Sequence, residues 1–277
     1  MNFLLGVGAQ RCGTTWLHRY LSQHPEVFIS PYKELHVFDA MFASEASGHT
    51  REKRFERLRL LLGKILRGEP VERQALMIAV ERYELSLGEE AYLAYFRRRV
   101  GPGHRVMGEI TPSYSLIPAS GFRFIRDFLL ESDLKPKVVF IMRDPVERMY
   151  SQLRLNQDMG VAEVSDAYAS ALSTPGIELR TRYDLTLTSL EGEFEAEELL
   201  VLFYEELFQA SSVEVICRFL DVEVRPADFS ARINAAPDIG EIDPDFRRAA
   251  RKHLDVVYEA CADRFGRDRV RALWRYF

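Results

Sequence analysis

The residues best suited to chemistry in this sequence follow its first apolar stretch. Residues 3–8 lead into a turn that reads GAQRCGTT. A glycine-bearing turn from a strand into a helix points backbone N–H groups and the positive end of the helix dipole at one place, which suits a phosphate or sulfate. The alternative is a glycine-tolerant turn in an ordinary α/β fold. Thr14 and Thr15 would add hydroxyl donors to such a site, and Arg11 would add a cation.

The spacing of Gly8 and Gly13 is that of a Walker A loop, but the lysine expected after the second glycine is replaced by Thr14. An ATP-hydrolysing loop needs that lysine on the β- and γ-phosphates. Here the cation lies inside the loop, at Arg11. A nucleotide or small-molecule kinase is therefore an alternative that the sequence disfavours.

A second candidate anion site follows an apolar run and reads RDPVERMYS. Asp144 is a good N-cap, Pro145 suits the first helical position, and Glu147 completes a pattern like a capping box. Arg143 is left at the carboxyl end of the strand, where open α/β sheets bind ligands, and Ser151 lies two helical turns further on. We expect Arg143 and Ser151 to converge on a second phosphate. The alternative is that both only cap and bridge locally.

Together these segments resemble the nucleotide motifs of sulfotransferases that use 3′-phosphoadenosine 5′-phosphosulfate (PAPS). GAQRCGTTWLHRYLSQHP resembles their 5′-phosphosulfate loop, and RDPVERMYS resembles their 3′-phosphate motif. The resemblance runs from about residue 3 to residue 220. Further segments resemble the carbohydrate, heparan-sulfate-type branch: KELHVFD at 33–39, GEITPSYS at 108–115, YDLTL at 183–187 and LLVLFYEEL at 199–207.

The resemblance implies transfer of a sulfuryl group from PAPS to an acceptor hydroxyl, on a carbohydrate or glycoconjugate. By this resemblance the 5′-phosphosulfate would be held by Gln10, Arg11, Cys12, Gly13, Thr14 and Thr15. The 3′-phosphate would be held by Arg143 and Ser151. Arg11 stands where the family usually has lysine and would stabilise the bridging oxygen. No metal is expected, because Arg11 and the loop amides supply the positive charge.

The resemblance also implies a catalytic base. Glu34 matches the base of the heparan-sulfate type, and His36 matches the histidine two residues on. If these residues continue a strand, their side chains point to one side. Glu34 would act as base if burial or neighbours raise its pKa. The alternatives are a solvated loop glutamate and a histidine satisfied in the core.

A third family segment contains Glu109 and Tyr114, and it departs from the pattern at Ile110, where many heparan-type members have lysine. Tyr183 fits a family tyrosine near the nucleotide or acceptor, and a core tyrosine fits equally well. We expect residues 204–207, YEEL, to be structural.

The elements that must position these residues alternate short apolar runs with amphipathic stretches, which predicts one α/β domain with a parallel sheet flanked by helices. The expected strands are Phe3–Gly8, Val27–Ser30, Arg105–Glu109, Lys137–Met142 and Leu199–Tyr204. The expected helices are Thr14–Gln23, Arg51–Leu66, Glu89–Arg99, Ala119–Leu130, Pro145–Asn156, Tyr183–Glu193, Ser212–Leu220 and Asp245–Phe265.

We interpret residues 1–277 as one sulfotransferase domain, with 51–105 as a helical insertion on the substrate side. That segment has 13 basic and 8 acidic residues, whereas the whole chain has a net charge of −5. Its charges form either a solvated helix face or a flap that attracts an anionic substrate.

Composition argues against several classes of protein and of site. Of the 277 residues 47% are hydrophobic, and the net charge of −5 argues against a nucleic-acid partner. Three cysteines without a CxxC spacing argue against a disulfide scaffold and a zinc site. Without a transmembrane or signal segment, we expect a cytoplasmic enzyme. A non-catalytic nucleotide-binding module is the second alternative, and the oligomeric state is not indicated.

Overall fold

A computed structural model describes residues 1–160, 168, 172, 174–230 and 242–277 of the chain. Within these residues five parallel strands form one sheet in the order β2-β3-β1-β4-β5. Each strand begins and ends within two residues of its predicted bounds, which confirms the predicted fold class. The strands are β1 (Asn2–Gly8), β2 (Val27–Ile29), β3 (Val106–Ile110), β4 (Lys135–Met142) and β5 (Leu199–Phe203).

The central strands are apolar because both of their faces are covered. In β1 every residue from Phe3 to Gly8 is buried, and in β4 the run from Val138 to Met142 is buried. Continuous apolar runs of this kind are typical of parallel strands with helices on both faces. The register between β1 and β4 shifts between Gly6 and Gly8, directly before the loop that the sequence singles out.

The predicted helices are all present, and the last of them is divided. Residues 245–265 form two helices separated at Leu254, whose backbone leaves the helical conformation. The helices are α1 (Thr14–Ser22), α2 (Val37–Phe42), α3 (Ser44–Ser47), α4 (Arg51–Leu66), α5 (Arg73–Glu84), α6 (Glu89–Arg97), α7 (Ala119–Glu131), α8 (Pro145–Asp158), α10 (Pro175–Glu178), α11 (Tyr183–Glu191), α12 (Tyr204–Leu207), α13 (Ala210–Leu220), α14 (Pro244–His253), α15 (Asp255–Phe265) and α16 (Arg267–Leu273), with 3₁₀ turns η1 (Leu85–Leu87), η2 (Pro112–Leu116) and η3 (Leu179–Thr181).

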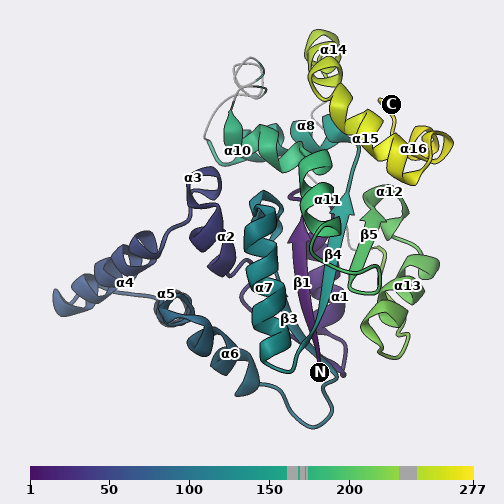
Figure 1. The fold of residues 1–277 in the computed structure, drawn as a ribbon. Coiled ribbons are helices and arrows are strands. Elements are labelled where there is room, and N and C mark those ends of the chain that lie inside the picture. The colour runs from purple at the N-terminus through teal and green to yellow at the C-terminus, as the bar shows by residue number, and fades with distance from the viewer. Residues whose placement is uncertain (161–167, 169–171, 173, 231–241) are drawn as a thin grey trace.

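Helices cover both faces of the sheet. In Figure 1, α7 and α11 lie across the near face and α1 lies behind it. On the near side the guanidinium of Arg123 in α7 pairs with Glu193, just beyond α11, at 2.8 Å. On the far side the hydroxyl of Tyr20 in α1 lies 3.2 Å from Sγ of Cys217 in α13. The second of these contacts holds α1, the helix that begins at the first anion loop.

The segment 51–105 is helical, as predicted. In Figure 1 helix α4 extends away from the sheet, and α5 and α6 lead the chain back to β3. The rings of Phe55 in α4 and Tyr83 in α5 lie 5.7 Å apart and join the two helices. No helix among the described residues is long and apolar enough to cross a membrane.

Candidate active site

The two predicted anion motifs meet in the structure. Nε of Arg11, in the loop after β1, donates a hydrogen bond of 3.0 Å to Oγ of Ser151 in α8. The two residues are 140 positions apart in the chain. Arg11 has a left-handed backbone, with φ of 68°, and Ser151 is buried. The loop and the start of α8 therefore form one continuous site.

The loop has the shape expected of an anion cradle. Gly13 precedes α1 with φ of 83°, and a Cβ there would lie 2.6 Å from Cδ2 of Leu207, so only glycine fits. No described side chain caps the start of α1, which is how a helix N-terminus that binds an anion is arranged. Thr14 is buried at this start.

The side chain of Cys12 lies in the core. Its side chain is fully buried, with Sγ 3.7 Å from the hydroxyl of Tyr183, and burial raises the pKa of the thiol to about 11. Tyr183 is itself fully buried, with its ring 5.8 Å from that of Phe140. The core interpretation of Tyr183 therefore fits its position, directly behind the loop.

Arginines gather around the junction of the two motifs. Burial lowers the pKa of Arg11, and the charges of Arg143, Arg154 and Arg148 lower it further. Arg148 is fully buried, and its Nη2 donates to the carbonyl oxygen of Ile177 at 2.9 Å. Its Nε and Nη1 have no hydrogen-bond partner within the described ranges. So much buried positive charge is costly unless an anion balances it.

The start of α8 is fixed differently from the prediction. Asp144 caps the helix as expected and accepts from the N–H of Val146 at 2.9 Å. The predicted capping-box role of Glu147 is wrong, because its carboxylate pairs with Arg143 at 2.9 Å. The N–H of Asp144 donates instead to Glu205 at 3.0 Å, and burial raises the pKa of Glu205 to about 7. This contact fits the structural role expected of residues 204–207.

Glu34 and His36 lie side by side, but not because they extend a strand. β2 ends at Ile29, and both residues have left-handed backbones, with φ of 64° and 56°. Nε2 of His36 lies 3.4 Å from Oε2 of Glu34, and its Nδ1 lies 2.9 Å from Oδ2 of the buried Asp39. The expectation of strand alternation is therefore wrong, although the side chains converge.

The expected upward shift of the Glu34 pKa is not found. Burial raises the pKa, but the hydrogen bond with His36 and the charge of Lys33 outweigh burial and lower it to about 2. For His36 burial lowers the pKa, and the bonds to Asp39 and Glu34 reverse the effect and raise it. Glu34 is thus an ionised carboxylate stabilised by two neighbours.

Lys33 connects this loop to the anion cradle. Its Nζ donates a hydrogen bond of 2.6 Å to Oγ1 of Thr15 and lies 3.4 Å from Oε1 of Glu34. Its side chain is 27% exposed. Lys33 lies in the KELHVFD segment, but no pattern in the sequence indicates its role, because only the fold brings it to Thr15.

Two arginines of the inserted segment hold the backbone of residues 33–36. Arg54 of α4 donates to the carbonyl oxygens of Leu35, at 2.8 Å, and of His36. Arg82 of α5 donates to the carbonyl oxygens of Lys33, at 3.3 Å, and of Glu34, at 3.4 Å. Neither residue could be identified from the sequence, because the charge pattern of the segment does not indicate which arginines turn inward.

The third family segment supports the same loop. The carboxylate of Glu109 is fully buried and accepts hydrogen bonds from Tyr92, Thr111 and Tyr114 at 2.6, 2.6 and 2.9 Å. Thr111 Oγ1 in turn accepts from the N–H of Leu35 at 2.9 Å. These residues are placed to support the loop rather than to contact a substrate.

One group of side chains has the composition of a metal site. Ligand atoms of His36, Asp39 and His49 lie within 4.8 Å of one another. The two imidazole rings are stacked, 3.5 Å apart and 16° from parallel. A metal binds in the plane of an imidazole, so one ion does not fit both rings in this arrangement. The expectation of a metal-free reaction stays a prediction.

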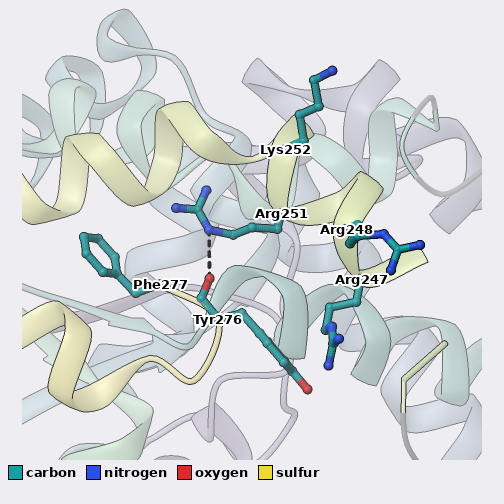
Figure 2. Close-up of a pocket in the computed structure, with 6 residues that line it drawn as sticks. All are labelled: Arg247, Arg248, Arg251, Lys252, Tyr276 and Phe277. Atoms are coloured by element: carbon teal, nitrogen blue, oxygen red, sulfur yellow. Dashed lines mark hydrogen bonds between the residues drawn. The ribbon is translucent and has the colours of Figure 1, made fainter. Parts of the chain in front are cut away.

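A cavity of about 350 Å³ lies apart from these residues, at the C-terminus. Figure 2 shows Nε of Arg251 donating to the carbonyl oxygen of Tyr276, at 2.8 Å. The N–H of Tyr276 donates to Asp144 at 2.7 Å, so the C-terminal tail holds the start of α8. The cavity is lined by Arg247, Arg248, Arg251, Lys252, Tyr276 and Phe277.

Comparison with known proteins agrees with this geometry. A model of the sulfotransferase family matches residues 4–226. This chain belongs to the sulfotransferase family. The matched residues include both anion motifs. The match shows that the chain is an enzyme of the PAPS-dependent kind, as the sequence predicted. Assignment to the carbohydrate branch stays a prediction.

One solved sulfotransferase shares the fold, and two others are more distantly similar to the chain. The crystal structure of a sulfotransferase from Alicyclobacillus acidocaldarius is 21% identical over 95% of each chain, with a TM-score of 0.63. The sulfotransferase domain of the Synechococcus PCC 7002 olefin synthase is 20% identical over 96% of this chain and 94% of that one, with a TM-score of 0.49. Mouse sulfotransferase SULT7A1 complexed with PAP is 14% identical over 98% and 86%, with a TM-score of 0.47. No curated protein matches the sequence.

Proposed function

We propose that this sulfotransferase transfers the sulfuryl group of PAPS to a hydroxyl of a carbohydrate or glycoconjugate acceptor. The observation that carries the proposal is the hydrogen bond of 3.0 Å between Arg11 and Ser151. This bond joins the motif that would hold the 5′-phosphosulfate to the motif that would hold the 3′-phosphate, so the two motifs can form one site. The arginines around this bond supply the positive charge that a doubly phosphorylated nucleotide requires.

The reaction needs positioning and charge stabilisation more than covalent chemistry. The acceptor oxygen forms a bond to sulfur while the bond from sulfur to the bridging oxygen breaks, and 3′,5′-ADP leaves. The donor is held by the cradle at the start of α1. This cradle consists of Gln10, Gly13, Thr14 and Thr15 together with the backbone of Cys12.

Glu34 takes the acceptor proton. Its low pKa keeps the carboxylate ionised, and the hydroxyl becomes strongly acidic as its oxygen bonds to sulfur, so a weak base suffices late in the transfer. His36 lies between Glu34 and the buried Asp39 and orients the carboxylate. No metal is needed in this mechanism, because side chains and loop amides provide the positive charge.

The acceptor class rests on the resemblance of residues 33–39 and 108–115 to the carbohydrate branch. The loop that holds Glu34 is fixed by α4 and α5 of segment 51–105. We therefore place this segment on the acceptor side of the domain, which spans residues 1–277. A cytoplasmic location belongs to the same proposal.

The test is transfer of radiolabelled sulfate from PAPS to a panel of sugars, glycolipids and phenols. Glu34→Gln should lower turnover at least a hundredfold while 3′,5′-ADP still raises the melting temperature. The matched control is Glu45→Gln, an exposed carboxylate of α3, which should leave turnover unchanged. Near-normal turnover in Glu34→Gln would remove this residue as the base.

The same assay separates the alternatives. A kinase would be stabilised more by ATP with magnesium than by 3′,5′-ADP. A non-catalytic module would bind 3′,5′-ADP and transfer sulfate to no acceptor in the panel.

A further inference from the structure

We infer that helices α4 and α5 of segment 51–105 dock on an anionic lipid bilayer, and that the acceptor hydroxyl belongs to a glycoconjugate anchored in that bilayer. The choice of acceptor rests on the proposed function. The docking rests on an exposed apolar row, on the charge around it and on its connection to the loop of the proposed base.

The apolar row runs along α4 and consists of Phe55, Leu62, Ile65 and Leu66. Leu62 lies seven residues after Phe55. Ile65 and Leu66 follow Leu62 at three and four residues, so the four side chains share one face of the helix. All four are exposed, by between 44% and 88%, and of the residues of α4, all of which the structure describes, only Leu61 is buried. An exposed apolar patch of this kind marks a surface that binds a membrane or another protein.

Helix α5 extends this apolar surface. The ring of Phe55 lies 5.7 Å from the ring of Tyr83 in α5. Val80 and Met77 precede Tyr83 at successive spacings of three residues, and both are exposed. In Figure 1 helix α4 extends away from the sheet, beyond the body of the domain. The exposed apolar side chains thus lie on the part of the molecule that projects, where a flat surface can contact them.

Charge favours an anionic surface over a second copy of this chain. Residues 51–67 contain seven basic and two acidic residues, a net charge of +5, whereas the whole chain has a net charge of −5. A bilayer that contains anionic lipids attracts such a basic segment, and insertion of its apolar side chains adds to the binding. Two copies that met through the same row would bring their basic segments together, and like charges repel.

The same two helices hold the loop of the proposed base. Arg54 of α4 and Arg82 of α5 donate to the carbonyl oxygens of residues 33–36. Arg54 directly precedes Phe55, and Arg82 directly precedes Tyr83. The apolar surface therefore begins one residue away from the hydrogen bonds that fix the loop.

This connection places the acceptor beside the base. From Phe55, next to the loop, the row extends about 17 Å outward to Leu66, at about 1.5 Å per residue. The side chain of Glu34 is 30% exposed, so an acceptor hydroxyl can approach it from outside. When the row lies on a bilayer, a glycan head group that stands above the bilayer meets the loop while its lipid chains remain in the bilayer.

The first experiment measures binding of the full chain to vesicles by sedimentation. The vesicles contain either phosphatidylcholine alone or equal parts of phosphatidylcholine and phosphatidylglycerol. The wild type should sediment with the mixed vesicles and bind the phosphatidylcholine vesicles at least tenfold more weakly. Leu62→Glu combined with Leu66→Glu should weaken binding to the mixed vesicles at least tenfold, because it places two charges on the apolar face.

The matched control is Leu130→Glu in α7, which lies across the sheet rather than on the projecting helices. Leu130 is 49% exposed and Leu62 is 46% exposed, and the control should bind vesicles as the wild type does. Arg57→Glu combined with Lys64→Glu tests the charge, and should reduce binding to the mixed vesicles to the level seen with phosphatidylcholine. The melting-temperature shift given by 3′,5′-ADP should be the same in all these proteins, which verifies that each one folds.

The second experiment measures turnover with a glycolipid in the mixed vesicles and with its free sugar head group. The wild type should transfer sulfate to the glycolipid at least tenfold faster than to the free head group. The Leu62→Glu and Leu66→Glu double variant should lose this difference, because it no longer binds at the bilayer.

The inference is overturned if the wild type does not sediment with the mixed vesicles, or if the double variant sediments as the wild type does. A dimer that light scattering detects in the wild type and not in the double variant would also overturn it, because the row would then bind a second copy. Equal turnover of the wild type with the glycolipid and the free head group would overturn the choice of acceptor. Failure of the proposed function looks different: the protein would bind vesicles through Leu62 and Leu66 and transfer sulfate to no acceptor.

Discussion

Replacing Arg54 with lysine tests whether the inserted segment positions the catalytic loop. Arg54 is half-buried and donates to the carbonyl oxygens of Leu35 and His36, and through Nη1 to that of Arg82 at 3.2 Å. A lysine ammonium is too compact to reach all three oxygens. Loss of one charged hydrogen bond to a buried carbonyl costs about 2 kcal/mol, within the usual range of 1.5–3 kcal/mol. If this energy fixes the loop, kcat should fall roughly 30-fold.

The assay pairs kcat with 3′,5′-ADP binding. Arg54 contacts neither anion motif, so the melting-temperature shift given by 3′,5′-ADP should remain within error of the wild type. Arg57→Lys, on the exposed side of the same helix, is the control and should keep full activity. Unchanged kcat in Arg54→Lys, or loss of 3′,5′-ADP binding together with kcat, would refute the positioning role.

Three further outcomes follow from the packing. Gly13→Ala should lose the melting-temperature shift given by 3′,5′-ADP, because its Cβ would lie 2.6 Å from Leu207 in a left-handed backbone; a retained shift would show that the loop adapts. Burial raises the pKa of Glu205 from about 4.5 to about 7, so the native state binds more protons in this window and the free energy of unfolding should fall as pH rises through it. Melting temperatures of Glu205→Gln should lack this decline, and an equal decline in the variant would assign it to another group. All three cysteines are buried and the pKa of Cys12 is raised to about 11, so Ellman's reagent should label the native protein at pH 8 only after denaturant is added; rapid native labelling would contradict this.

The strands of the sheet could be predicted from the sequence because their apolar pattern matches their burial in the structure. Val138 to Met142 is apolar throughout and becomes a central strand, and Asp144-Pro145 marks the start of α8. The break at Leu254 carries no proline or glycine, so periodicity alone extended one helix across it. The short helices α2 and α3 are too brief for a 3.6-residue period to be recognised.

The residues of the site could be predicted only where a single sequence motif contains them. Arg11 and Ser151 were both identified, but which of them contact each other depends on how α8 packs against the loop. Lys33 and Arg54 gain their roles from side-chain contacts with Thr15 and with residues 33–36, across distances that no local pattern encodes. The low pKa of Glu34 has the same origin, since it follows from the neighbours that the fold supplies.

The most direct measurement is calorimetric titration of the wild-type protein and Arg143→Ala with 3′,5′-ADP and with 5′-AMP. If Arg143 and Ser151 bind the 3′-phosphate while the loop around Thr14 binds the 5′ end, the wild type should bind 3′,5′-ADP at least a hundredfold more tightly than 5′-AMP. Arg143→Ala should lose most of this preference for 3′,5′-ADP. Equal affinity of the wild type for the two nucleotides, or an equal loss of both in the variant, would contradict a single site built from both motifs.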